Sequence, residues 1–293
     1  MATSSSRSEP PSVEVPIDSY NPPMNDHPSV AIIGVGAMGE ALFSGLQRAG
    51  WAPDQLSLCV RREDRVTDLA QRSTSLVTLD PIEAIQARQV VVIAVKPRDV
   101  GVVIDRLAAR VDAGHMLLSL AAGITTRTYE DRLGEVAVVR AMPNTPALVG
   151  EGVTGIAGGA HAGEEHLKLA TEVLGAVGGV RVMDESLLDA VTAVSGTGPA
   201  YVFLLAEALT EAAVREGLPR DIAEEFVHQT IRGAGHLLTD TDGTPAELRS
   251  QVTSPGGTTA AAVHILEERG FRALVEDAVR AAARRAAELG EQG

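Results

Sequence analysis

Apolar residues in the first half of the chain gather in short uninterrupted runs, and segments with helical spacing separate these runs. Such runs are typical of strands that are buried on both faces, as in a parallel sheet. Strands are expected at residues 30–33, 56–60, 90–95, 116–120, 136–140 and 180–183. Helices are expected between them, for example at 40–49 and 63–70. The alternation predicts an α/β domain.

The pattern becomes purely helical after residue 183. From Pro199 onward apolar residues recur at helical spacing and cover nearly the whole helix circumference, and the segments 221–238 and 271–289 are similarly rich in apolar residues and alanine. A helix that is apolar all round has to be buried. We therefore expect these helices to pack against a second subunit, although a tightly packed monomer would satisfy the same composition.

Composition narrows the classes of function. The first 28 residues are rich in Ser, Pro, Asn and Asp, which predicts a disordered tail without the apolar core of a signal peptide. No apolar run reaches the length that spans a membrane, so no membrane partner is expected. The net charge of −14 opposes nucleic-acid binding. These features are typical of a cytoplasmic protein that acts on a small molecule.

Cysteine and histidine add little chemistry. The single cysteine, Cys59, excludes an internal disulfide and is expected to be a core residue of its strand. The 7 histidines show no spacing typical of metal ligands, so no metal site is expected.

A glycine motif follows the first expected strand without a gap. The string is Gly34-Val35-Gly36-Ala37-Met38-Gly39, and a helix follows it. In a dinucleotide site the first glycine makes the turn, the second admits the pyrophosphate, and the third allows close packing of helix on strand. We expect a cofactor to contact Gly34, Gly36, Ala37, Met38 and Gly39.

The end of the second strand indicates which cofactor binds. An NAD site places an acidic residue there, whereas this chain has Arg61 and Arg62. Two guanidinium groups suit the 2′-phosphate of NADPH, so NADPH is expected, with NADH as the alternative cofactor. A solvated basic patch at the start of the next helix would look the same.

Residues beyond three further strands are expected to line the same crevice, because ligands bind at the carboxyl ends of the strands in open parallel sheets. These residues are Val95, Lys96, Pro97, Ala121, Ala122 and Asn144. Lys96 and Asn144 are candidates for contacts near the nicotinamide or the substrate. Either could equally stabilise its own loop.

A second string, Ser254-Pro255-Gly256-Gly257-Thr258-Thr259, leads into an apolar helical run. Proline and glycines end the preceding helix, so Thr258 and Thr259 are expected at a helix N-terminus. Free backbone N–H groups at that end, together with two hydroxyls, can bind a small carboxylate. An ordinary capped helix has the same appearance.

Taken together, the two strings resemble those of the pyrroline-5-carboxylate reductases. The likeness extends to residues 94–97, 121–124, 140–146, 193–201 and 248–267. It implies an α/β Rossmann-like NADP-binding domain at 29–184, after a tail at 1–28, and an all-α dimerisation domain at 185–293. It also implies reduction of L-1-pyrroline-5-carboxylate to L-proline, the last step of proline biosynthesis, by a homodimer that can assemble into a decameric ring.

The resemblance further implies roles for individual residues. Thr259 is similar in position to the catalytic hydroxyl that hydrogen-bonds the imine nitrogen, and Ser254, Gly257 and Thr258 to the group that binds the substrate carboxylate. Lys96 is expected beside the substrate and the cofactor, and Gln251 is similar to a residue that contacts cofactor across the dimer. Two departures are Thr197, where serine is commoner, and the N-terminal extension.

Two other readings remain open at this level. One is another NADP-dependent imine reductase or a β-hydroxyacid dehydrogenase, although hydroxyacid oxidation calls for a Lys or His base and residues 184–293 contain no lysine. The other is a nucleotide-sensing dimer without catalysis. Reduction of a C=N bond needs a hydride donor, a substrate anchor and a proton, and a cyclic imine takes up a proton near neutral pH, so a hydroxyl can suffice.

Overall fold

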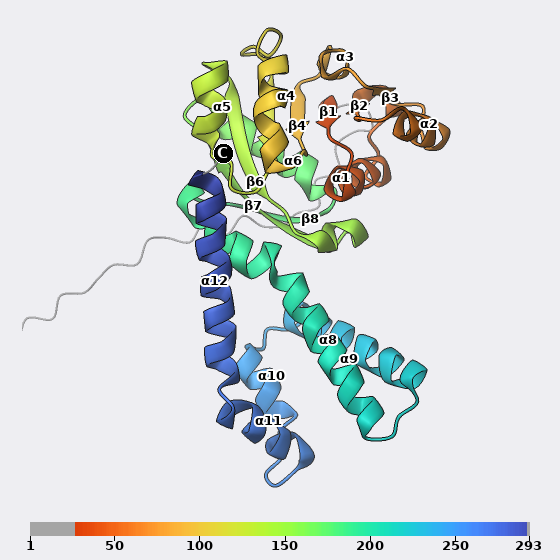
Figure 1. The fold of residues 1–293 in the computed structure, drawn as a ribbon, viewed down its shortest axis with the longest axis vertical. Helices are drawn as coiled ribbons and strands as arrows, with labels where there is room; N and C mark the ends of the chain where they lie inside the picture. The colour runs from red at the N-terminus through yellow and green to blue at the C-terminus, as the bar shows by residue number, and fades with distance from the viewer. Residues whose placement is uncertain (1–26, 292–293) are drawn as a thin grey trace, which may run out of the picture.

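A twisted sheet of 8 strands forms the N-terminal part of the computed structural model, which describes residues 27–291 (Figure 1). The strand order is β3-β2-β1-β4-β5-β6-β7-β8, and neighbours are parallel except β6 and β7. This order confirms the Rossmann-like domain. The strands are β1 (Val30–Ile33), β2 (Leu56–Cys59), β3 (Leu76–Thr78), β4 (Val90–Ile93), β5 (Met116–Ser119), β6 (Ala137–Met142), β7 (Gly152–Gly158) and β8 (Gly178–Val182).

Helices cover both faces of the sheet. On one side lie α1 (Ala37–Arg48), α2 (Glu63–Arg72) and α6 (Glu164–Gly175), and on the other α3 (Pro81–Ile85), α4 (Val100–Leu107) and α5 (Thr126–Leu133). Successive side chains of a strand point to opposite faces, so Ile32 packs in the first layer and Ile33 in the second. Burial on both faces explains why the strands are uninterrupted apolar runs.

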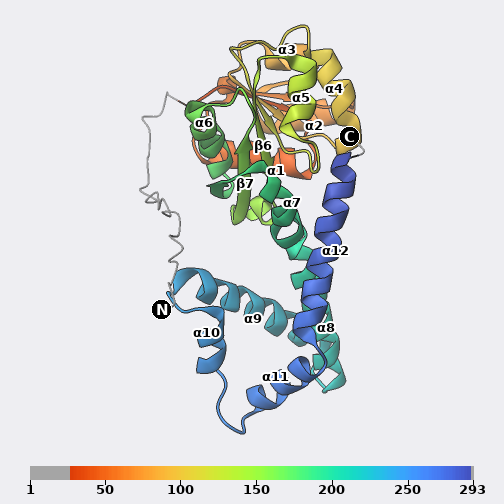
Figure 2. The same cartoon turned by 90° about the vertical axis from the view of Figure 1, so that its left-hand side faces the viewer.

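The C-terminal part is entirely helical. Its elements are α7 (Leu188–Val191), a π turn at Thr192–Gly196, α8 (Gly198–Arg215), α9 (Arg220–Asp240), α10 (Pro245–Gln251), α11 (Thr258–Glu268) and α12 (Phe271–Glu291). Helices α8 and α9 pack together, and α10 and α11 lie at the end farthest from the sheet (Figures 1 and 2). Helix α12 returns to the sheet, where Gly290 lies against the backbone of Gly123. The all-α second domain is thus confirmed.

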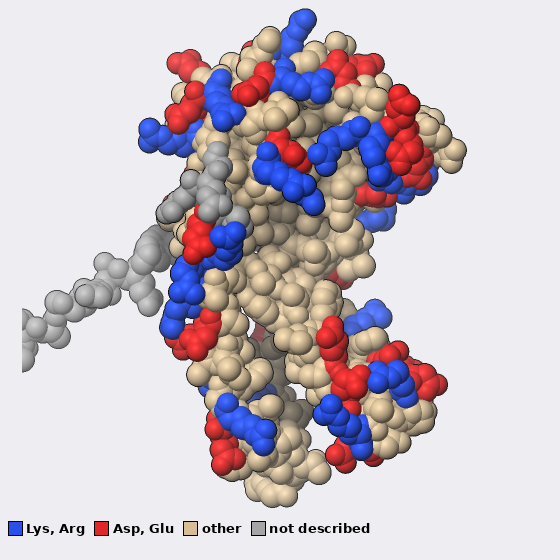
Figure 3. Space-filling model, viewed as in Figure 1, with Lys and Arg blue, Asp and Glu red and all other residues tan. Residues whose placement is uncertain are grey.

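Large apolar side chains of these helices are exposed in the single chain. Leu204 on α8 is 66% exposed and Phe226 on α9 is 64% exposed. Figure 3 shows few charged side chains over the half of α8 nearer the sheet, whereas charges of both signs gather over the far ends of α8 and α9 and over the sheet domain. The surface that the sequence predicted to need a second subunit is therefore present and uncovered.

One membrane expectation is corrected. The helical run Glu185–Arg215 is long and apolar enough, by length and composition, to cross a membrane, and only 11% of its apolar window is buried. The sequence reading counted uninterrupted apolar residues. In the structure, α7, the π turn and α8 form one continuous helical run. Polar residues interrupt the apolar residues of this run, but they are few enough for the segment to be apolar on average.

A buried arginine joins the two parts of the chain. Arg140 on β6 donates to Asp189 Oδ1 at 3.0 Å and to Glu185 Oε1 at 3.4 Å. Glu185 in turn accepts from the backbone N–H of Thr126 at 2.9 Å and from its hydroxyl at 2.7 Å. These charge-assisted hydrogen bonds hold the start of the helical part against the sheet.

The chain before β1 is described from His27 onward. His27 stacks on Trp51 with ring centroids 3.7 Å apart, and Trp51 Nε1 donates to the carbonyl of Pro28 at 3.0 Å. Most of the tail expected at residues 1–28 therefore lies outside the described residues, and its last two residues pack on the sheet domain.

The environment of Cys59 leads to a first prediction. Burial raises the pKa of its thiol to about 11, so the nucleophilic thiolate is scarce at neutral pH. Because the thiol of an unfolded chain has a pKa of about 9, we expect native protein at pH 8 to react with iodoacetamide roughly 100-fold more slowly than denatured protein. Mass spectrometry of timed samples measures this. Equal rates would contradict the core position of Cys59.

Candidate active site

A cavity of about 650 Å³ opens at the carboxyl ends of β1, β2 and β4. The strand order places β2 and β4 on either side of β1, so the segments beyond these three strands converge. Of the predicted cofactor residues, Gly34, Gly36, Arg61, Arg62, Val95 and Lys96 line this cavity together. Tertiary structure thus brings three separate sequence motifs to one site.

The glycine loop has the shape that a dinucleotide requires. Gly34 has φ +97°, and a Cβ there would lie 2.7 Å from the Val95 side chain. A Cβ on Gly36 would meet nothing within 4 Å, whereas one on Gly39 would overlap the carbonyl oxygen of Gly34. Open space at Gly36 beside the start of α1, where no side chain caps the helix, leaves first-turn N–H groups for a pyrophosphate. The residues present therefore fit the cofactor.

Arg61 and Arg62 extend from the end of β2 into solvent. Their side chains are 74% and 70% exposed, and each has a carboxylate partner: Asp99 lies 3.1 Å from Arg61, and Asp64 lies 3.3 Å from Arg62. Exposed pairs of this kind are weak and exchange readily for a better anion. Both arginines are therefore available to a 2′-phosphate.

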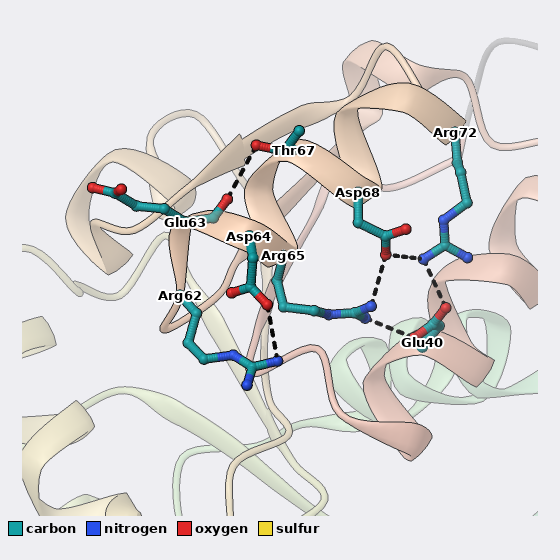
Figure 4. A network of polar contacts seen from close by, with 8 residues as sticks. All are labelled: Glu40, Arg62, Glu63, Asp64, Arg65, Thr67, Asp68 and Arg72. Carbon is teal, nitrogen blue, oxygen red and sulfur yellow. Dashed lines mark hydrogen bonds and ion pairs between the residues drawn. The ribbon is translucent and has the colours of Figure 1, made fainter.

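A third arginine, Arg65, lines the same cavity and was missed by the sequence reading. Its guanidinium donates to Glu40 at 2.8 Å and to Asp68 at 2.7 Å, so it is held more firmly than its neighbours (Figure 4). Arg65 lies in the first turn of α2, shortly after Arg61 and Arg62 in the sequence. A third basic residue so close to the strand end was the available signal in the sequence.

Glu40 links the glycine helix to the arginine helix. It lies in the first turn of α1 and accepts from Arg65 and Arg72 of α2, both at 2.8 Å (Figure 4). Burial alone would raise the pKa of Glu40, but the hydrogen bonds and charges of the two arginines outweigh it and lower the pKa. The carboxylate is therefore ionised at neutral pH and fixes α2 against α1.

Asn144 stabilises its own surroundings. Its side-chain N–H donates to Ser195 Oγ at 3.1 Å, and its side-chain oxygen accepts from the backbone N–H of Val153 at 3.0 Å. These bonds tie the segment after β6 to β7 and to the π turn. The loop-stabilising alternative accounts for its geometry, and contact with cofactor stays a prediction.

The remaining cofactor candidates lie near the cavity but away from its wall. Pro97 opens the 3-10 turn Pro97–Asp99 that follows Lys96. Ala121 is buried and Ala122 half-buried beyond the end of β5. Ala37 and Met38 form the first turn of α1, next to the glycines. Their contacts with cofactor also stay predictions.

The second motif forms a tight loop before a helix. Helix α11 begins at Thr258, as the sequence predicts, with Gly257 as its N-cap and no side-chain acceptor for the free N–H groups. Gly256 has φ +72°, a conformation that favours glycine, and a Cβ on Gly257 would overlap the Ser254 hydroxyl. Ser254, Gly257, Thr258 and Thr259 are therefore gathered around one helix start that can hold an anion.

The loop and the cofactor cavity lie far apart within one chain. Figures 1 and 2 both place the α10–α11 region at the end of the helical part, and the cavity belongs to the sheet domain at the other end. Gln251, the last residue of α10, lies beside the loop and is exposed. Lys96 is the one substrate candidate in the described chain that lies with the cofactor cavity.

Comparison with known proteins identifies the family. A family model described as pyrroline-5-carboxylate reductase dimerisation matches residues 185–289, and one described as NADP oxidoreductase coenzyme F420-dependent matches residues 29–123. A pyrroline-5-carboxylate reductase of Mycobacterium tuberculosis is 44% identical over 284 residues, which cover 89% of this chain and 96% of that protein. The chain belongs to the pyrroline-5-carboxylate reductase family. The family resemblance read from the sequence is thus confirmed.

Solved structures of this family have the same fold. The chain matches a pyrroline-5-carboxylate reductase of Coxiella burnetii with a TM-score of 0.85 at 35% identity, covering 90% of this chain and 99% of that one. It matches the Plasmodium falciparum enzyme, solved with NADP bound, with a TM-score of 0.80 at 29% identity, covering 90% and 98%. The expected nicotinamide cofactor is confirmed for the family, and the individual contacts stay predictions.

The glycine loop provides a second prediction with a matched control. Gly39→Ala should lower the free energy of unfolding by about 1–3 kcal/mol, because the added methyl overlaps the Gly34 carbonyl. Gly36→Ala adds the same methyl to open space, so stability should change by less than about 1 kcal/mol while NADP⁺ binding weakens. Denaturant unfolding and calorimetric titration measure the two effects. The reverse ranking of stabilities would contradict the assigned roles.

Proposed function

We propose that this protein reduces L-1-pyrroline-5-carboxylate to L-proline with NADPH, in the cytoplasm, as the last step of proline biosynthesis. The observation that carries the proposal is the combination of an NADP-type cavity with the Ser254–Thr259 loop at a free helix start. Relatives that match nearly the whole chain are named for this activity. NADH serves as the alternative hydride donor.

The cofactor domain binds and orients the hydride donor. When bound, the dihydronicotinamide supplies the hydride. Gly36 and the first-turn N–H groups of α1 would hold the pyrophosphate, and Arg61, Arg62 and Arg65 would hold the 2′-phosphate. Val95 and Lys96, at the opposite wall, would border the reacting end. The hydrogen bonds of Glu40 with Arg65 and Arg72 hold the start of α1 against α2.

The helical domain would bind the imine. Its carboxylate suits the start of α11, where the helix dipole is positive and the Ser254 and Thr258 hydroxyls add donors. The Thr259 hydroxyl would donate to the imine nitrogen and place the adjacent carbon toward the hydride. Because the imine takes up a proton near neutral pH, this hydroxyl positions charge and need not be a strong acid.

A second subunit would complete the site. Within one chain the loop and the cavity are at opposite ends, and the apolar surfaces of α8 and α9 are uncovered. A homodimer that buries these surfaces could bring the loop of one subunit to the cavity of the other. The match of residues 185–289 to the family model described as pyrroline-5-carboxylate reductase dimerisation supports this proposal. Assembly of such dimers into a decameric ring is a further part of it, carried by the family resemblance.

The reaction is tested directly. Purified protein should oxidise NADPH in the presence of 1-pyrroline-5-carboxylate and form proline in equal amount, measured by absorbance and amino-acid analysis. A β-hydroxyacid dehydrogenase would instead turn over a hydroxyacid, and a nucleotide sensor would bind NADPH without turnover. Absence of proline with both NADPH and NADH would overturn the proposal.

Thr259→Val should lower kcat/KM by about 10²–10³, with the lower end expected because solvent can supply the proton. Valine keeps the shape but removes the donor, so the fold and NADP⁺ affinity should be retained. Thr258→Val is the matched control and should raise KM more than it lowers kcat, because Thr258 is assigned to the carboxylate. Wild-type kinetics for Thr259→Val across neutral pH would show that Thr259 is only a helix-terminal residue.

Mixed dimers test whether the site is shared. Gly36→Asp should abolish cofactor binding without unfolding α1, because Asp is a good N-cap whose carboxylate repels the pyrophosphate. If each site takes its cavity and its loop from different subunits, refolding this variant together with Thr259→Val yields dimers with one intact site. We expect activity well above that of either parent. No gain in verified mixed dimers would mean that each subunit forms its own site.

A further inference from the structure

Asp99 lies on the wall of the cofactor cavity, next to Arg61. It ends the turn Pro97–Asp99 beyond β4, and its Oδ2 lies 3.1 Å from Nη1 of Arg61, which stands beyond β2. Because β1 lies between β2 and β4, this ion pair connects the two walls on either side of the glycine loop. The side chain of Asp99 is 28% exposed.

The other charged side chains that line the cavity in the described chain are basic. They are Arg61, Arg62, Arg65, Lys96 and Arg106. The acids that pair with Arg65 and Arg106, which are Glu40 and Asp80, do not line the cavity. An anionic ligand that enters the cavity therefore meets one carboxylate on its wall, that of Asp99.

The place of this carboxylate matters for the choice of cofactor. A site for NADH carries an acid beyond the second strand, where it accepts from the ribose 2′-hydroxyl, and a site for NADPH carries arginine there. Here the arginine stands at that position, and an acid reaches it from the turn after β4. The two features have opposite effects on a 2′-phosphate, which carries nearly two negative charges at neutral pH.

We propose that Asp99 is a specificity-determining residue that limits the preference for NADPH over NADH. Its carboxylate neutralises Arg61 and repels the 2′-phosphate, which has to displace it to reach the guanidinium. The 2′-hydroxyl of NADH carries no charge and is not repelled. The inference deepens the proposed function by assigning its cofactor selectivity, and it concerns binding, so it does not depend on hydride transfer.

The test is the affinity of Asp99→Asn for NADP⁺ and NAD⁺, measured by calorimetry without substrate. Removal of one nearby charge at an exposed pair should tighten NADP⁺ binding about three- to tenfold, and NAD⁺ binding should stay unchanged or weaken. The fragment 2′,5′-ADP, which carries the 2′-phosphate, should bind more tightly to Asp99→Asn. The fragment 5′-AMP, which lacks this phosphate, should not. The gain should shrink at high ionic strength, because the charges are exposed.

Two further variants make the result specific. Asp99→Glu keeps the charge and should keep a ratio of affinities near that of the wild type. Asp105→Asn removes the same charge from α4. Asp105 does not line the cavity, and its carboxylate lies 3.3 Å from the guanidinium of Arg132. This variant should leave the ratio of NADP⁺ to NAD⁺ affinity unchanged. Thermal unfolding without cofactor verifies that all three variants are folded.

Several outcomes would overturn the inference. Weaker or unchanged NADP⁺ binding by Asp99→Asn would show that Asp99 positions Arg61 for the phosphate or has no part in selectivity. If Asp99→Asn bound both cofactors more tightly by the same factor, or if Asp105→Asn gained as much affinity for NADP⁺, the change in net charge alone would explain the effect. A protein that binds both cofactors but forms no proline would contradict the proposed function while leaving this measurement valid.

Discussion

The apolar surface of the helical domain cannot be buried by one chain, and the rest of the molecule's arrangement depends on this constraint. Side chains such as Leu204 and Phe226 remain largely exposed, and burial of each would contribute about 1.5–3 kcal/mol. The helical run from Glu185 to Arg215 extends this surface away from the sheet. The same extension places the Thr258 loop far from the cavity of its own chain, which is the reason for proposing a site shared between two subunits.

The cofactor cavity, by contrast, is lined by residues of the sheet domain of a single chain. Its glycine loop is formed by packing between β1, α1 and Val95, and its basic wall is held by Glu40 and Asp68. Apart from Gln251, the residues proposed to bind the cofactor therefore all lie in the sheet domain. In the proposed function, the substrate is bound by the loop before α11, in the helical domain.

Some elements escaped the sequence reading for identifiable reasons. Strand β7 (Gly152–Gly158) is rich in glycine, which reads as a loop, and it forms because antiparallel pairing with β6 satisfies its backbone. Arg65 lies beyond the strand end to which the sequence pattern assigns the cofactor contacts, and α2 carries it back to the cavity. Asn144 was placed near cofactor by its strand end alone, and its bonds to Ser195 and Val153 depend on β7 and the π turn.

The sequence by itself determined the features that act over a few residues. The glycine loop between β1 and α1, the helix start at Thr258 and the arginines after β2 all follow from local sterics and turn chemistry. Only the tertiary structure decided which distant groups meet. Arg61 and Asp99 are 38 residues apart and pair because strand order places β2 and β4 on either side of β1. No local pattern encodes such a contact, since it depends on how the strands are arranged in space.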